Sequence, residues 1–305
     1  MSYLSENINS FRDDGFIDLG PILDKDKCSK LLEQVRNTRE WSQNLFRSKE
    51  DCLSDPQMKK TNPGKGICNL AENYDLDFIE KHPVFTQHLE RILGNNYQIL
   101  LQKFVVGVPN NWVPDWLKPV IEPQLVSNLG PYIKKQFRDV TYFRGIDYHM
   151  DLIDHPGTVG DYVTVYVYLD DVNENMSPLH LVEKSHMFGA TKFPHTILND
   201  NLDSIEYGKD RESTKKFRKN ILTGKCGSVY LWSSMTLHGT KPHEADQPRI
   251  SLRYTIQKDR YQRNTLIDQL IESVANRKAS SIMRDDIDLN SKNHQQLKFN
   301  KTLKK

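Results

Sequence analysis

The sequence lacks the features of membrane, secreted and disulfide-rich proteins. None of its apolar runs approaches the roughly 20 residues that a membrane-spanning helix needs. The first segment, MSYLSENINSFRDDG, contains no apolar signal-peptide core. The four cysteines, Cys28, Cys52, Cys68 and Cys226, show no CxxC spacing, so we expect reduced thiols. These absences predict a cytoplasmic protein with no membrane partner.

An excess of charge of one sign is also missing from most of the chain. The formal net charge is +2, yet residues 291–305 (SKNHQQLKFNKTLKK) carry five lysines and no acidic residue. The rest of the chain is therefore slightly acidic, which predicts no nucleic-acid partner. We expect residues 291–305 to form a basic flexible tail, with contact to an anionic partner as the alternative.

The composition is that of a globular protein, with 37% hydrophobic and 27% charged residues in a chain of 305. This length fits one large domain or two small ones. We expect a single domain over residues 1–305, with a core at about 97–257. Apolar periodicity predicts a helix that Asp24 caps, a helix over 83–93 that ends at Gly94, and a helix over 264–276 that Asn264 caps.

The segment from 137 to 257 has the pattern of β-strands. In DYVTVYVYLDD (161–171), valines and a leucine alternate with threonine and tyrosines, and RISLRYTIQ (249–257) alternates in the same way. GSVYLWSSMTLHG (227–239) is also typical of a strand. Strands with one apolar and one polar face favour a sandwich or barrel whose polar face lines a cavity.

Residues 107–136 precede this β-rich segment and contain five of the fourteen prolines. Trp112 and Trp116 lie among these prolines. Prolines at this density break regular structure. A surface excursion is one interpretation. A lid insertion over a site is the other, because long loops in compact domains tend to be functional.

The stretch YHMDLIDHPG contains two histidines and two aspartates. Residues two apart in a strand point to the same side, so His149 and Asp151 can share a metal ion. A third ligand such as His238, at the end of a later strand, would complete the two-histidine, one-carboxylate set that Fe(II) oxygenases use. The HxD pattern alone is weak, since such polar pairs recur by chance. Asp154 and His155 are interpreted as loop residues.

Arg249 opens the strand that follows His238, and Ser251 lies on the same face. A guanidinium and a hydroxyl on one face can bind one carboxylate. A surface salt bridge is the ordinary alternative for an arginine. Arg253 shares the face and is a rival anchor.

Taken in order, these motifs resemble the phytanoyl-CoA dioxygenase-like family of Fe(II)/2-oxoglutarate-dependent oxygenases. FRDDGFIDLGPILDKDKCSKLL resembles the family's opening strand and helix, and YHMD resembles its HxD motif. A Ser-His pair (Ser185-His186) and HGTKPHEADQPRISLRY follow in the family's order. The proline-glycine commonly found before Ser-His is VEK here. The resemblance covers residues 11–37 and 139–257, and it implies a mainly β double-stranded β-helix (jelly-roll or cupin-like) core with flanking helices.

The resemblance also implies roles at the matching positions. His149, Asp151 and His238 would bind Fe(II), and Arg249 would hold the distal carboxylate of the cosubstrate 2-oxoglutarate. Ser251 and Thr240 would assist, and Tyr166 would lie on the cavity wall. His186 would make a structural hydrogen bond.

The implied reaction uses O2 to hydroxylate a small organic molecule and releases succinate and CO2. Halogenating relatives have a small residue in place of the carboxylate, so Asp151 favours hydroxylation or a related oxidation. A cupin-like metalloenzyme that does not use 2-oxoglutarate, and a non-catalytic double-stranded β-helix binding protein, are the alternatives. The substrate, the position that is oxidised and the oligomeric state do not follow from the sequence.

Overall fold

The computed structural model describes residues 3–56, 68–122, 126–154, 158–191, 193, 195–208 and 212–274. Residues 291–305, predicted as a basic tail, and His155 lie outside the described residues. The predicted single domain over 1–305 therefore stays a prediction. Among the described residues, no helix is both long and apolar enough to cross a membrane.

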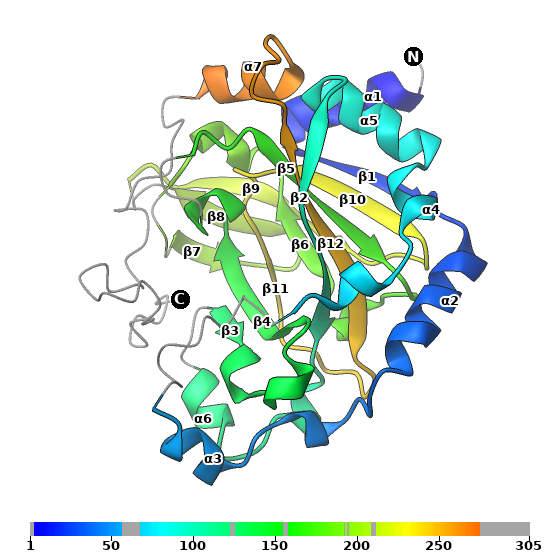
Figure 1. Ribbon diagram of the computed structural model, residues 1–305. Helices are drawn as coiled ribbons and strands as arrows, with labels where there is room; N and C mark the ends of the chain where they lie inside the picture. The colour runs from blue at the N-terminus through cyan, green and yellow to red at the C-terminus, as the bar shows by residue number, and fades with distance from the viewer. Residues whose placement is uncertain are drawn as a thin grey trace.

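Strands dominate the described residues and join in a mixed sheet with the order β1-β10-β5-β12-β2-β4-β11-β6-β9-β8-β7, while β3 pairs with β4 (Figure 1). The two outermost strands, β1 and β7, do not pair with each other, so the sheet is not a closed barrel. The strands are β1 Phe16–Pro21, β2 Tyr97–Gly107, β3 Val126–Asn128, β4 Thr141–His149, β5 Tyr162–Tyr168, β6 Leu179–Val182, β7 Thr196–Asp200, β8 Ser204–Gly208, β9 Lys215–Leu222, β10 Ser228–Ser233, β11 His238–Thr240 and β12 Arg249–Lys258.

The helices lie outside the sheet. They are α1 Tyr3–Asp14, α2 Lys25–Arg36, α3 Lys49–Ser54, α4 Asp77–Glu80, α5 Pro83–Leu93, α6 Lys118–Ile121 and α7 Leu266–Ser273. Asp24 caps α2 by accepting a hydrogen bond from the Lys27 amide, as predicted, and Gly94 ends α5 with φ at 88°. The predicted cap of the last helix is wrong. Thr265 caps α7 through a reciprocal capping box with Asp268, and Asn264 precedes the cap.

The main hydrophobic core lies between these helices and the outer faces of β5 and β12. Val163, Val165 and Val167 of β5 pack with the apolar stripes of α2 and α5, which contribute Leu32 and Leu89 among others. This is the apolar face that the alternation in residues 161–171 predicts, and it leaves the opposite face of β5 pointing into the molecule.

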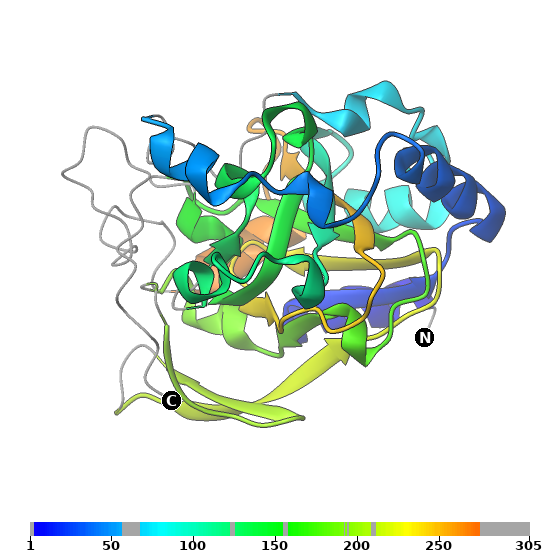
Figure 2. The same ribbon diagram turned by 90° about the horizontal axis from the view of Figure 1, so that it is seen from below.

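A second buried cluster, rich in aromatic side chains, lies on that inner face. It contains Tyr166 and Tyr168 of β5, Tyr230 and Trp232 of β10, and, from β6 on the other side, Leu181. The two halves of the sheet therefore face each other across this cluster, as in a jelly roll. Figure 2 shows β7, β8 and β9 as a ribbon that curves along one side of the molecule.

Residues 107–136, predicted as a lid insertion, contain α6, β3 and short 3-10 turns in their described part. Val108, Val113, Leu117 and Leu129 from this segment are buried in the main core. Much of the segment is thus packed structure, and its action as a lid stays a prediction.

The turn after α2 is tied to the start of β4 by a buried ion pair. The Arg39 guanidinium donates two hydrogen bonds of 2.6 Å to the Asp139 carboxylate, one to each oxygen. Only 4% of the Arg39 side chain and 11% of the Asp139 side chain are exposed. Arg39 also donates to the Tyr142 hydroxyl and to the Phe137 carbonyl.

Arg39→Met leaves the Asp139 carboxylate buried without its cation, so we expect a loss of about 3–5 kcal/mol in the free energy of unfolding. Arg36→Met is the matched control, because the Arg36–Asp170 pair is 39% and 43% exposed and such pairs contribute less than about 1 kcal/mol. Chemical denaturation measures the free energy of unfolding of both variants. An equal decrease in the two variants would contradict the structural role of Arg39.

Candidate metal centre

Three predicted side chains, His149, Asp151 and His238, come together at the ends of strands. His149 is the last residue of β4 and pairs in register with His238, the first residue of β11. The expectation that Asp151 continues the strand is wrong, because Asp151 begins a 3-10 turn. The Leu152 amide donates to the Ser234 carbonyl, which holds this turn against the segment before β11. The carboxylate reaches the histidines from the turn.

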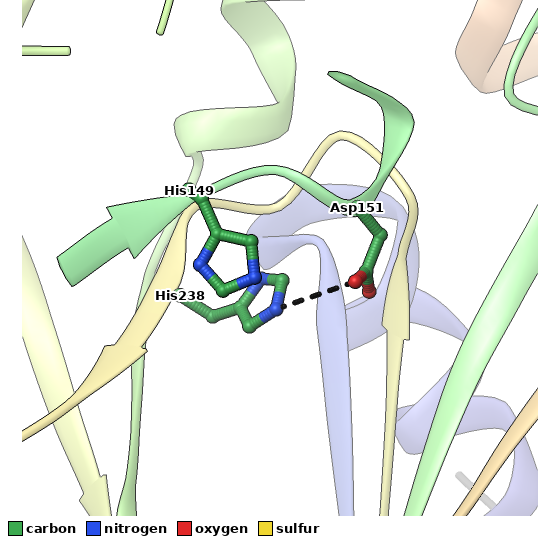
Figure 3. Close-up of side chains that lie close together, drawn as sticks. All are labelled: His149, Asp151 and His238. Atoms are coloured by element: carbon green, nitrogen blue, oxygen red, sulfur yellow. Dashed lines mark ion pairs between the residues drawn. The ribbon is translucent and has the colours of Figure 1, made fainter. Parts of the chain in front are cut away.

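The three side chains are spaced as ligands of one metal ion would be. One ligand atom from each lies within 4.8 Å of the others. Nε2 of His238 is 3.7 Å from Oδ1 of Asp151, and the two imidazole centroids are 4.2 Å apart. Figure 3 shows the rings and the carboxylate grouped around a common point. Two imidazoles and one carboxylate are the donor set of non-haem Fe(II) sites with open positions.

Each imidazole is oriented by its other nitrogen. Nδ1 of His149 lies 3.0 Å from the Asp147 carbonyl, and Nδ1 of His238 lies 2.9 Å from the Thr236 carbonyl. A carbonyl only accepts, so Nδ1 carries the proton and Nε2 keeps its lone pair for a metal. Burial, and then the nearby His149 ring, lower the pKa of His238 to about 3, so His238 is neutral at physiological pH.

Asp151 is buried among hydrogen-bond donors. The Thr164 hydroxyl and the Trp232 indole donate to Oδ2 at 2.6 and 3.1 Å, and the Arg253 guanidinium donates to Oδ1 at 2.5 Å. Burial alone would raise the pKa of Asp151, but the charge of Arg253, with smaller contributions from His238 and His149, holds this pKa well below its usual value. The carboxylate is therefore ionised and can bind a cation.

Arg249 has a different environment from Arg253. It is buried, and its guanidinium donates to the Tyr166 hydroxyl at 3.2 Å and more weakly to Ser251 at 3.5 Å. Its Nε has no hydrogen-bond partner, and among the described residues no acidic side chain forms an ion pair with it. Gly107 lies opposite on β2, where a Cβ would approach Nε to 3.4 Å. A buried guanidinium without an acid is a receptor for an anion.

The structure supports the roles predicted for Tyr166, Thr240 and His186 to different degrees. Tyr166 stacks on Trp232, whose ring centroid is 5.0 Å from that of His238, so contacts run continuously from Arg249 to the candidate metal ligands. The Thr240 hydroxyl accepts a hydrogen bond from the Ile146 amide, and its role toward a cosubstrate stays a prediction. His186 makes the expected structural hydrogen bond, to the Arg12 carbonyl.

Sequence reasoning assigned no role in the site to Thr164 and Trp232, and it considered Arg253 only as an anchor for 2-oxoglutarate. Thr164 lies on the polar face of β5, and Trp232 lies in the strand segment before His238. The sequence predicts that both residues lie in strands. Only the fold shows that they pair in register with each other beside Asp151.

Comparison with known protein families matches residues 11–251 to the family described as Phytanoyl-CoA dioxygenase (PhyH). The chain belongs to the phytanoyl-CoA dioxygenase family. The match confirms the resemblance and extends it through residues 40–136, where the motifs are poor. Among curated proteins, no significant match was found.

Solved structures of the epimerase SnoN confirm the jelly-roll prediction. The epimerase SnoN, in complex with Fe3+, alpha ketoglutarate and nogalamycin RO, aligns with a TM-score of 0.51 and 14% identity over 84% of this chain and 83% of its own. A second SnoN structure gives the same score and identity. The carbocyclase SnoK aligns at 0.47 and 13% identity over 92% and 93% of the two chains.

Membership of the family makes this chain an enzyme of the non-haem iron, 2-oxoglutarate-dependent class. The family acts on small molecules and uses Fe(II), 2-oxoglutarate and O2. Among the described residues, His149, Asp151 and His238 form the group that could hold a metal ion.

Arg253→Met removes the cation beside the buried Asp151 carboxylate. We expect the metal-free protein to lose about 3 kcal/mol of stability. Because the buried Asp151 carboxylate of this variant would take up a proton in place of its lost cation, Mn(II) should raise the melting temperature of this variant less than that of the wild type. Thermal melts with and without Mn(II) measure both effects. Arg253→Lys is the control and should lie between the two, whereas an equal Mn(II) effect in Arg253→Met and wild type would argue against the charge balance.

Proposed function

We propose that this protein is an Fe(II)/2-oxoglutarate-dependent dioxygenase that hydroxylates a small organic molecule and releases succinate and CO2. His149, Asp151 and His238 would hold the iron. Arg249, with Ser251, Tyr166 and Thr240, would bind the distal carboxylate of 2-oxoglutarate. The observation that carries the proposal is the pairing of a three-ligand site with a buried arginine that lacks an acid.

The charges of the site support Fe(II) as the ligand. Asp151 is ionised and both imidazoles offer a lone pair at Nε2, so the three groups bring one negative charge to a divalent cation. This leaves a net positive charge at the metal that an anionic ketoacid would reduce further. The donor types favour Fe(II) over Mg(II) or Ca(II), which prefer all-oxygen sites.

Arg249 supports 2-oxoglutarate as the second ligand. Burying a guanidinium without an acid is costly, and the cost is offset when a ligand carboxylate binds to it. The guanidinium fork matches a carboxylate in two parallel hydrogen bonds, and the Tyr166 and Ser251 hydroxyls beside it can donate as well. Arg253 is less suited to this role, because it already pairs with Asp151.

When bound, iron with 2-oxoglutarate and O2 supplies the oxidising power, with one oxygen atom entering succinate and the other entering the substrate. The protein's part is to hold the reactants in place and to limit water. Trp232 and Tyr166 form a buried wall beside His238, and the described part of residues 107–136 packs over the core as the proposed lid. Asp151 itself favours hydroxylation, because the carboxylate occupies the place where halogenating relatives have a small residue.

The separate roles of the metal ligands and Arg249 can be tested by thermal melts. Ligands that bind the native state stabilise it, by about 2.7 kcal/mol at a concentration 100 times the Kd. We expect Mn(II) to raise the melting temperature of the wild type and 2-oxoglutarate to raise it further. His238→Ala should lose both effects, and Arg249→Met should keep the Mn(II) effect and lose that of 2-oxoglutarate.

Arg36→Met, at an exposed ion pair, is the control and should retain both shifts. If 2-oxoglutarate stabilises Arg249→Met as much as the wild type, the assignment of Arg249 is wrong. If neither ligand stabilises the wild type, the protein is a jelly-roll binding protein without this chemistry.

Turnover should be measured as succinate formed from 2-oxoglutarate across a panel of metabolites, with the product analysed by mass spectrometry. We expect a substrate that gains one oxygen atom, and no succinate above background with His149→Ala. A product of unchanged mass would contradict hydroxylation and point to an epimerisation, the activity named for SnoN. Oxygen consumption that needs no 2-oxoglutarate and survives in Arg249→Met would favour the cupin-like alternative.

A further inference from the structure

The carboxylate of Asp151 has nearly all of its hydrogen-bonding capacity filled by the protein. An ionised carboxylate offers about four lone-pair positions, two on each oxygen. Thr164 and Trp232 both donate to Oδ2, and Arg253 donates to Oδ1. The lone pair that remains therefore belongs to Oδ1, which is the oxygen nearer His238.

The three donors come from adjacent strands and have little freedom to move. Thr164 and Trp232 pair in register across β5 and β10, and both are buried, at 0% and 1% exposure. Arg253 pairs in register with Tyr166 on the other side of β5. Three neighbouring strands of the sheet thus point their donors at one carboxylate.

We infer that Thr164, Trp232 and Arg253 are positioning residues that fix Asp151 as a one-oxygen metal ligand. The inference rests on the proposed function and extends it. With one atom from each of the three ligands, an octahedral ion keeps three open positions. The cosubstrate takes two of these through its ketoacid group and O2 needs the third. If Oδ2 also bound the metal, the position for O2 would be lost.

The donors to Oδ2 are the decisive ones, because they occupy the oxygen that would otherwise become the second ligand atom. Thr164→Val keeps the shape of the side chain and removes the hydroxyl donor. Trp232→Phe removes the indole donor from the other side. Each change frees one lone pair on Oδ2, so both variants should allow the carboxylate to bind through two oxygens. Thr164→Ser keeps the hydroxyl and is the matched control.

The number of open positions can be counted without turnover, from the effect of bound Mn(II) on the relaxation rate of water protons. This effect scales with the number of water molecules on the metal. In the wild type and in Thr164→Ser we expect three waters, and one after saturation with 2-oxoglutarate. In Thr164→Val and Trp232→Phe the contribution of bound water should fall by about a third, and it should vanish with 2-oxoglutarate.

Equal hydration of wild type and both variants in the presence of 2-oxoglutarate would overturn the inference and leave the proposed function intact. So would a folded variant that no longer binds Mn(II), since the change should add a ligand atom and not remove one. Wild-type protein that shows no Mn(II) binding would instead overturn the proposed function. The same loss of metal-bound water is expected in Thr164→Val and in Trp232→Phe. If one of them fails to fold, the other still tests the inference.

Discussion

The ion pair between Asp151 and Arg253 is the interaction on which the candidate metal centre depends. A carboxylate this deeply buried would take up a proton if it had no cation nearby, and a protonated acid is a poor metal ligand. Arg253 keeps it ionised, and the hydroxyl of Thr164 and the indole of Trp232 orient it. The two histidines then need only remain neutral, and burial together with the neighbouring His149 ring ensures this for His238 by lowering its pKa.

The same strand provides two arginines with different tasks. Arg249 and Arg253 lie on one face of β12, and both point into the molecule toward the aromatic cluster of β5 and β10. Arg253 is neutralised by Asp151, whereas Arg249 donates to the Tyr166 hydroxyl and lies over the Tyr166 and Tyr168 rings, with no acidic partner among the described residues. Arg253 balances the charge of Asp151, and Arg249 stays without an acidic partner among the described residues. On the proposed function, the site would therefore have one place for a cation and one for a carboxylate, with Tyr166 and Trp232 between them.

Much of this could be predicted from the sequence, because the relevant patterns are local or strongly periodic. Alternation in residues 161–171 and 249–257 predicts which faces are buried, and the order of the motifs predicts the metal ligands and the family. The pattern could not show that Asp151 leaves the strand, because this turn depends on a contact with Ser234. Nor could the strand pattern alone distinguish Arg249 from Arg253, since both lie on the polar face. The family resemblance favours Arg249, and the tertiary pairing of Arg253 with Asp151 separates the two.

The most direct test of this account is titration calorimetry of 2-oxoglutarate into Mn(II)-loaded protein, compared between the two arginine variants. We predict one binding site per chain in the wild type and a loss of about tenfold to a hundredfold in affinity for Arg249→Met, the range expected for a charge-assisted hydrogen-bonding pair. Arg253→Met, once loaded with metal, should bind 2-oxoglutarate with an affinity much closer to that of the wild type. A larger loss in Arg253→Met than in Arg249→Met would contradict the division of roles between the two arginines.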